Sequence, residues 1–274
     1  MHSLMNHCFP TFIFLFYLII FLLLSKVVFH FKRKLTKNAE DTAMDIVGSI
    51  GAFYSIFLGF VIYILWTNYQ KTYELVNTEA SQLYITAQSA KAFPPEIQQK
   101  VITNLSLYIS SIVNDDLVAM SLGEEGKTTQ GIGDNLYRIL LHYQPKASVA
   151  NFYQSAVSAW NQATQSRDFR LNMLNPAIPI AWYIIIFLGA FFIIGIYSLE
   201  SSLQGHPFLY ILCIFLAIYM TAITVLSFPY SGWVKVSDVP FNRLYKTLNN
   251  LPIQSSIKIG EGAKSNNFLS SSFN

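Results

Sequence analysis

The chain has 274 residues, of which 53% are hydrophobic and 12% are charged, whereas soluble domains carry roughly 25% charged residues. This composition excludes a disordered chain and a coiled coil, and the net charge of +3 is too small to indicate a nucleic-acid partner. The two cysteines, Cys8 and Cys213, are too few for a disulfide framework or a structural zinc site. The composition indicates an integral membrane protein.

Four apolar segments reach the length of about 20 residues that a helix needs to cross a bilayer. They cover residues 11–31, 46–66, 178–197 and 207–228, and the last three contain no charged residue. The first segment has no basic stretch before it and no small-residue cleavage site after it, so we interpret it as a retained helix rather than a signal peptide. We therefore predict four transmembrane helices.

The polar stretch between the second and third segments carries 8 basic and 9 acidic residues over positions 67–176. Apolar residues repeat at helical spacing in three runs that begin at Val76, Ile97 and Val149. We predict an all-α membrane protein with four transmembrane helices and a helical-bundle insert between the second and third. The predicted divisions are 1–66 for the first two spans with their basic loop, 67–176 for the insert, 177–230 for the last two spans, and 231–274 for a short C-terminal segment with a disordered Ser/Asn-rich end.

No motif predicts an enzyme. The sequence has no HExxH zinc motif, no GxSxG nucleophile elbow and no GxGxxG loop. The second, third and fourth spans contain no ionisable residue of the kind that proton-driven carriers use. We expect no catalytic residues, no metal site and no cofactor.

The second span, residues 46–66, has two distinct helical faces. One face collects small residues at a spacing that lets another helix approach closely: Gly48, Gly51, Ser55 and Gly59. A second line, with one residue per turn, contains Ala52, Ile56 and Phe60. Two interpretations are open: a tightly packed structural helix, or a pore helix whose apolar rings form a constriction that gates by dewetting.

The run Phe57-Leu58-Gly59-Phe60, followed by Trp66 and Tyr69, resembles the neck helix of the bestrophin chloride channels. The pattern is similar to that of the bacterial bestrophin-like family over about residues 45–250. Further pieces stand in the same order along the chain: Glu79-Ala80, Leu107-Tyr108, Arg167 with Arg170, Pro179 with Trp182, Pro229-Tyr230-Ser231-Gly232, and Pro240-Phe241.

This resemblance implies a pentamer in a bacterial inner membrane, with the second helix of each protomer lining a central pathway for small anions. It implies that Phe60, Ile56 and Ala52 line the constriction. Two departures are visible: Phe53 stands where the bestrophin neck has a proline, and the acidic calcium clasp is missing, since Asp238 is the only acidic residue between Gly232 and Pro240. We therefore expect no calcium gating of that kind.

Charge and resemblance disagree about topology. Lys32, Arg33 and Lys34 follow the first span, so the positive-inside rule favours a cytoplasmic loop there and an external insert. Lys235 and Arg243 follow the fourth span and favour the opposite orientation. The resemblance implies cytoplasmic termini and a cytoplasmic insert, and we follow it; the basic loop would then bind lipid headgroups or concentrate anions outside.

Three charged residues of the insert are candidates for a polar clamp: Glu79, Arg167 and Arg170. Antiparallel helices would bring them together, and the alternative is that all three are solvated. For the whole chain we carry two hypotheses. The first is a homo-oligomeric anion channel, and the second is a non-conducting membrane scaffold or sensor whose insert binds a protein partner. Neither involves nucleic acid.

Overall fold

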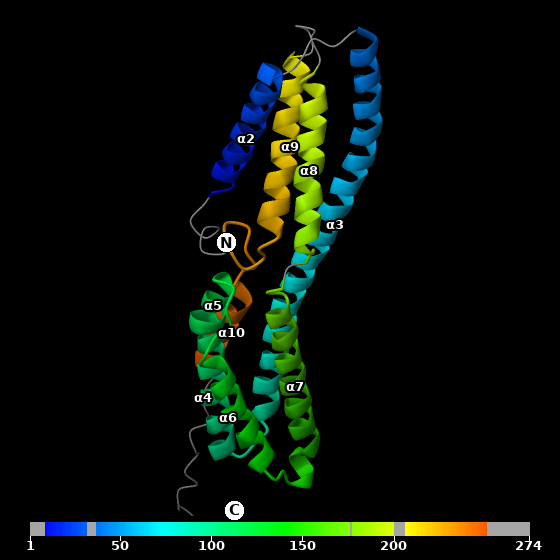
Figure 1. Ribbon diagram of the computed structural model, residues 1–274. Helices are drawn as coiled ribbons and strands as arrows, with labels where there is room; N and C mark the ends of the chain where they lie inside the picture. Colours follow the sequence, from blue (N-terminus) through cyan, green and yellow to red (C-terminus); the bar gives the residue numbers. More distant parts are fainter. Residues whose placement is uncertain (1–8, 32–36, 176, 200–205, 251–274) are drawn as a thin grey trace, which may run out of the picture.

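The computed structural model describes residues 9–31, 37–175, 177–199 and 206–250, and contains no strand among them (Figure 1). Cys8, the basic residues Lys32, Arg33 and Lys34, and the Ser/Asn-rich end lie outside the described residues. The helical elements are α2 (Pro10–Phe31), α3 (Lys37–Ala90), α4 (Pro95–Ser111), η1 (Ile112–Asp116), α5 (Leu117–Ser121), α6 (Thr129–His142), η2 (Ala147–Val149), α7 (Ala150–Asn172), α8 (Ile180–Tyr197), α9 (His206–Leu226) and α10 (Val239–Asn249).

The four predicted spans are confirmed as helices long and apolar enough to cross a membrane: Pro10–His30, Asn38–Ala90, Ile180–Tyr197 and Pro207–Leu226. In this half of the molecule α2 packs on α9 and α3 packs on α8. Two hydroxyl contacts lock the group, from Tyr17 to Thr224 at 2.8 Å and from Tyr183 to Ser227 at 2.7 Å. Phe9, just before α2, lies against Trp233 with ring centroids 4.7 Å apart, so the start of α2 and the end of α9 lie at the same end of the group.

Helix α3 continues without a break through the predicted boundary between residues 66 and 67. It has 54 residues, which corresponds to a length of about 80 Å, and it forms part of both halves of the molecule (Figure 1). The change from apolar to polar composition after Trp66 alters the surroundings of the helix, but no proline or glycine follows there to end it. The helix ends at Ala90, shortly before Pro94 and Pro95.

The second half is the predicted helical bundle, built from the lower part of α3 with α4, α6, α7 and α10. Its core contains Leu83, Leu105, Leu136 and Trp160, all almost fully buried. Helix α10 belongs to this core, because Phe241, Leu244 and Leu248 are buried in it. The predicted C-terminal segment is therefore not separate from the insert, since residues 236–248 complete its packing.

Close packing of α3 on α8 depends on a glycine. Tyr54 of α3 is buried and donates a hydrogen bond to the carbonyl oxygen of Ile186 at 2.6 Å. Its ring lies so close to Gly189 that a Cβ atom on residue 189 would overlap it. A Cβ atom on Gly195, six residues further along α8, would meet nothing within 4 Å.

Replacing Gly189 by alanine is expected to lower the free energy of unfolding by about 1–3 kcal/mol, because the Tyr54 ring must leave its hydrogen-bonded position. The matched control Gly195→Ala is expected to be neutral or slightly stabilising, since alanine favours helix more than glycine. Thermal unfolding in detergent measures both variants. Equal melting temperatures for the two would contradict this packing argument.

Candidate functional site

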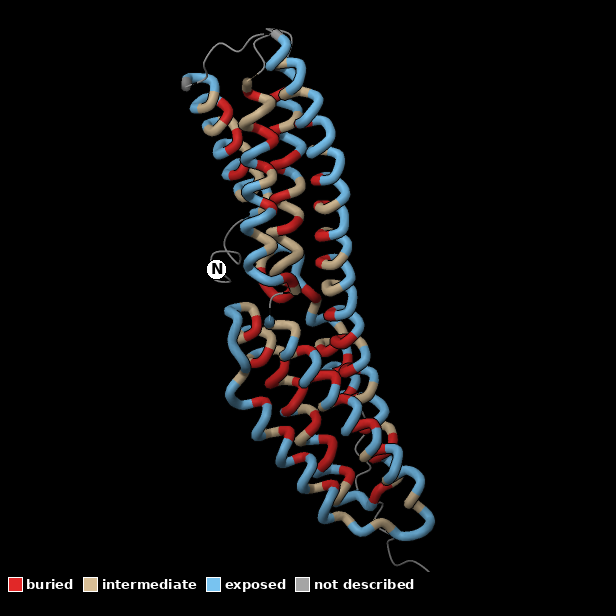
Figure 2. Tube along the Cα trace, turned by 45° about the vertical axis from the view of Figure 1, so that its right-hand side comes forward, coloured by how far each residue is buried: buried red, intermediate tan, exposed pale blue. Residues whose placement is uncertain are grey.

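The candidate pore line lies on the outer face of α3. Ile56 and Phe60 are 71% and 54% exposed, and Ala52 is exposed as well. The opposite face of α3 carries Leu58 and Val61, which are buried against the other membrane helices. The line is therefore open on the single chain, as the exposed colouring of α3 in Figure 2 shows.

The small-residue face of the second span is also open. A Cβ atom added at Gly48, Gly51 or Gly59 would meet no atom within 4 Å. Ser55 is exposed, and its hydroxyl donates to the carbonyl oxygen of Ala52 at 2.8 Å within the same helix. Among the described residues of this chain, no other helix packs closely on the three glycines.

The line continues beyond the membrane half, which the sequence reasoning missed. At 100° per residue the positions that follow Phe60 on the same side of α3 are Tyr63, Thr67, Gln70, Glu74, Thr78 and Ser81, and all of them are exposed. The stripe is apolar as far as Tyr63 and polar from Thr67 onward. Two charged residues lie on this exposed side, Lys71 and Glu74, and their side chains are 3.7 Å apart, so their charges balance.

Below the membrane half, the structure brings two of the three clamp candidates into direct contact. Glu79 of α3 accepts hydrogen bonds from Nε and Nη2 of Arg170 at 2.8 and 3.3 Å. Arg167 lies one turn before Arg170 on α7, but it pairs with Asp116 and not with Glu79. All of these side chains are at least 95% buried.

Asp116 is the member of this cluster that the sequence reasoning missed. It accepts from Nε and Nη2 of Arg167, both at 3.0 Å, and from Nη2 of Arg170 at 2.9 Å. It ends η1, a π-helical turn, which places Asp116 inward while Asp115 accepts from the backbone N–H and hydroxyl of Thr128 at 2.8 and 2.7 Å. The available signal was the adjacent acidic pair Asp115-Asp116, which holds the only charged residues of the stretch 101–123.

We call Glu79, Asp116, Arg167 and Arg170 the buried charge cluster. The two negative charges of its carboxylates balance the two positive charges of its guanidinium groups. Burial raises the pKa of the Glu79 carboxyl above its ordinary value, and the Arg170 guanidinium opposes that rise. Burial lowers the pKa of Arg170, but Glu79 and Asp116 outweigh this effect and keep the guanidinium charged.

The cluster joins several elements at the top of the bundle, near the membrane half. Nη1 of Arg170 donates to the sulfur of Met120 at 2.9 Å, and its guanidinium lies 5.9 Å from the ring centroid of Phe241. The hydroxyl of Tyr230, which follows α9, donates to the carbonyl oxygen of Arg170 at 3.1 Å. Arg170 therefore connects α3, η1, α5, α10 and the segment after α9.

This arrangement is suited to holding elements together rather than to catalysis or metal binding. Each carboxylate oxygen of the cluster already accepts from a guanidinium. In the part of the chain that the structure describes, no three His, Cys, Asp or Glu side chains could hold a metal ion.

Replacing Arg170 by methionine is expected to lower the free energy of unfolding by about 3–5 kcal/mol, because Glu79 then remains as a buried charge without a partner. Lys100→Met, which breaks the exposed pair with Glu96, is the matched control and is expected to leave the free energy of unfolding nearly unchanged. Adding Glu79→Gln to Arg170→Met is expected to recover part of the loss. Thermal unfolding measures this cycle, and equal losses for the two methionine variants would contradict it.

Comparisons with known proteins agree with this architecture. A model of the bestrophin-like domain matches residues 12–241. A variant of a bacterial bestrophin homologue from Klebsiella pneumoniae superposes with a TM-score of 0.63 at 11% identity, over 86% of this chain and 99% of that one. Another solved structure, described as a membrane protein, superposes with a TM-score of 0.62 at 11% identity, over 89% of this chain and 99% of that one. No curated protein matches the sequence. Since the family model covers most of the sequence, the chain belongs to the bestrophin-like family of membrane proteins.

Proposed function

We propose that this protein is a homo-oligomeric channel for small anions, in which α3 of each protomer lines a central pathway. The observation that carries the proposal is the exposed stripe on α3. It faces away from every other helix that the structure describes, and it changes from apolar to polar where α3 leaves the membrane half. A stripe that is not covered within its own chain is available to line a shared axis.

Anion passage does not need a fixed positive charge on this stripe. The edge of an aromatic ring is electropositive, so phenyl edges of Phe60 arranged around an axis tolerate a passing anion. Ile56 and Ala52 extend an apolar constriction that can gate by dewetting. We propose these three residues as the lining of the constriction.

Four helices of one protomer cannot enclose a wide aqueous pathway, so the proposal requires assembly around an axis. The open small-residue face with Gly48, Gly51, Ser55 and Gly59 supports this, because nothing in the described chain fills it and such faces allow close helix contact. We propose a closed ring, with a pentamer as the form that the family resemblance implies.

We further propose that the protein lies in a bacterial inner membrane with the helical bundle and both termini in the cytoplasm. An even number of spans places the insert and both termini on one side. Lys235, Arg243 and Lys246 then lie on the cytoplasmic side, as the positive-inside rule favours. The residues described here carry no arrangement that favours an enzyme.

Phe60→Glu is expected to reduce halide flux about tenfold or more, because a ring of carboxylates in an apolar constriction repels anions. Phe60→Ala removes the same ring without adding charge and is expected to retain flux. Reconstitution into liposomes with a halide-sensitive dye measures both. Unchanged flux in Phe60→Glu would remove Phe60 from the pathway.

Native mass spectrometry of the protein in mild detergent is expected to give one closed ring. Gly51→Leu is expected to reduce the mass toward the monomer, since the larger side chain blocks an interface at a position where an added Cβ atom meets no atom of the described chain within 4 Å. Gly195→Leu, at an equally open glycine of α8, is the control that keeps the assembly. A wild-type monomer would favour the scaffold or sensor hypothesis instead.

A further inference from the structure

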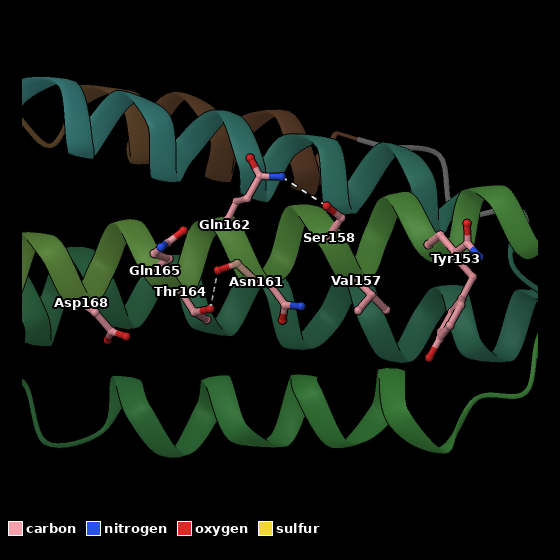
Figure 3. A pocket seen from close by; sticks show the side chains of 9 residues that line it. Tyr153, Val157, Ser158, Asn161, Gln162, Thr164, Gln165 and Asp168 are labelled. Carbon is pink, nitrogen blue, oxygen red and sulfur yellow. Dashed lines mark hydrogen bonds between the residues drawn. The ribbon is translucent and has the colours of Figure 1, made fainter.

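A polar cavity of about 220 Å³ lies between α6 and α7 on the side of the helical bundle. Its polar lining comes from Gln130 and Asp134 of α6 and from Asn161, Thr164 and Asp168 of α7. The last three residues also line a wider groove along α7. Figure 3 shows their side chains projecting from α7 toward α6.

The inner wall of the cavity is aromatic. Tyr108 and Trp160 line it and lie edge to face, with ring centroids 5.0 Å apart. Gly133 of α6 makes this wall possible, because a Cβ atom there would lie 3.1 Å from the Tyr108 ring and 3.6 Å from the Trp160 ring. Tyr137 adds a third aromatic ring to the lining. Among the described residues, the buried hydroxyl of Tyr108 has no hydrogen-bond partner.

The charge of Arg167, at the base of the cavity, is already compensated. Its Nε and Nη2 atoms donate to Asp116, and Nη1 donates to Oε1 of Gln130 at 2.8 Å. Gln130 in turn donates from Nε2 to Oδ1 of Asp134 at 3.0 Å. This chain of hydrogen bonds runs from the buried charge cluster to the cavity and holds the Asp134 carboxylate in place.

The negative charges of the two cavity carboxylates, Asp134 and Asp168, are not compensated in the way that the charge of Arg167 is. Neither Asp134 nor Asp168 forms an ion pair within the described residues. Arg138 lies one turn after Asp134 on α6, but it is not part of the lining. Both residues are exposed, so the open side of the cavity presents two negative charges beside aromatic faces, and both features attract cations.

We propose that this cavity binds a small organic cation that carries a primary ammonium group. An ammonium has three donors and no acceptor, which matches a lining of carboxylate, amide and hydroxyl oxygens from Asp134, Asp168, Asn161 and Thr164. The rings of Trp160 and Tyr137 contact the alkyl part of the ligand and attract its charge. This site lies in the bundle, and none of its lining residues belongs to α3.

The test uses the full-length protein in detergent with 1,4-diaminobutane as the probe and butyrate as the anionic counterpart at equal ionic strength. Isothermal titration calorimetry is expected to show saturable binding of the diamine, with one molecule per protomer. Thermal unfolding is expected to show that the diamine raises the melting temperature. Butyrate is expected to do neither. The double variant Asp134→Asn with Asp168→Asn is expected to bind the diamine at least about tenfold more weakly, a change that corresponds to roughly 1.4 kcal/mol of binding free energy.

The matched control is Glu124→Gln with Glu125→Gln, which removes the same charge from exposed positions outside the cavity and is expected to keep the affinity. Asp168→Asn alone, at a position without a structural ion pair, is expected to give an intermediate loss and covers the case in which the double variant does not fold. Equal diamine binding by the wild type and the Asp168→Asn variant would overturn the proposal. So would equal binding of butyrate and diamine, or saturable binding of magnesium chloride in place of the diamine.

Discussion

The burial of Arg170 is the constraint on which the arrangement of the two halves depends. A guanidinium removed from water is stable only when its donors and its charge are satisfied, and here that takes Glu79 from α3 and Asp116 from η1. Met120, Phe241 and Tyr230 complete its surroundings. Elements that are far apart in the sequence must therefore meet at one point, between the membrane helices and the bundle. Such a cluster contributes less to stability than to fixing which elements meet, since a misplaced partner leaves an unpaired buried charge.

Helix α3 makes that constraint relevant to function. The same 54-residue helix carries Phe60 in its membrane half and Glu79 in the bundle. Glu79 lies 19 positions after Phe60 on this continuous helix, a separation of about 28 Å. Any rotation or shift of the membrane half of α3 is transmitted to Glu79, and the paired guanidinium of Arg170 resists it. The buried charge cluster thus fixes the angular position of the exposed stripe relative to the bundle.

Much of this fold could be predicted from the sequence, and the exceptions have physical reasons. Hydropathy is a property of whole segments, so the four spans followed from composition alone. The boundary at residue 66 did not mark the end of a helix, because the polarity of the surroundings and the continuity of the backbone are separate properties. Asp116 was missed because a π-helical turn shifts the side-chain register, and helical spacing does not show such a shift. The contribution of α10 to the core was missed because the sequence of a short amphipathic helix indicates that one face is buried but not which helices that face packs against.

The two interpretations of the second span lead to different expectations for the outer face of α3 below the membrane half. A structural helix with aromatic residues toward lipid needs no continuation below the membrane, and its outer face there would carry scattered charges like any solvated surface. The stripe keeps its angular position from Ala52 to Ser81 and becomes polar below the membrane half, with Thr67, Gln70, Thr78 and Ser81 in line. The two charges on this side, Lys71 and Glu74, lie 3.7 Å apart and balance. A face that stays in register, apolar in the membrane half and polar without net charge below it, supports the proposal that α3 follows one aqueous pathway along both halves of the protein.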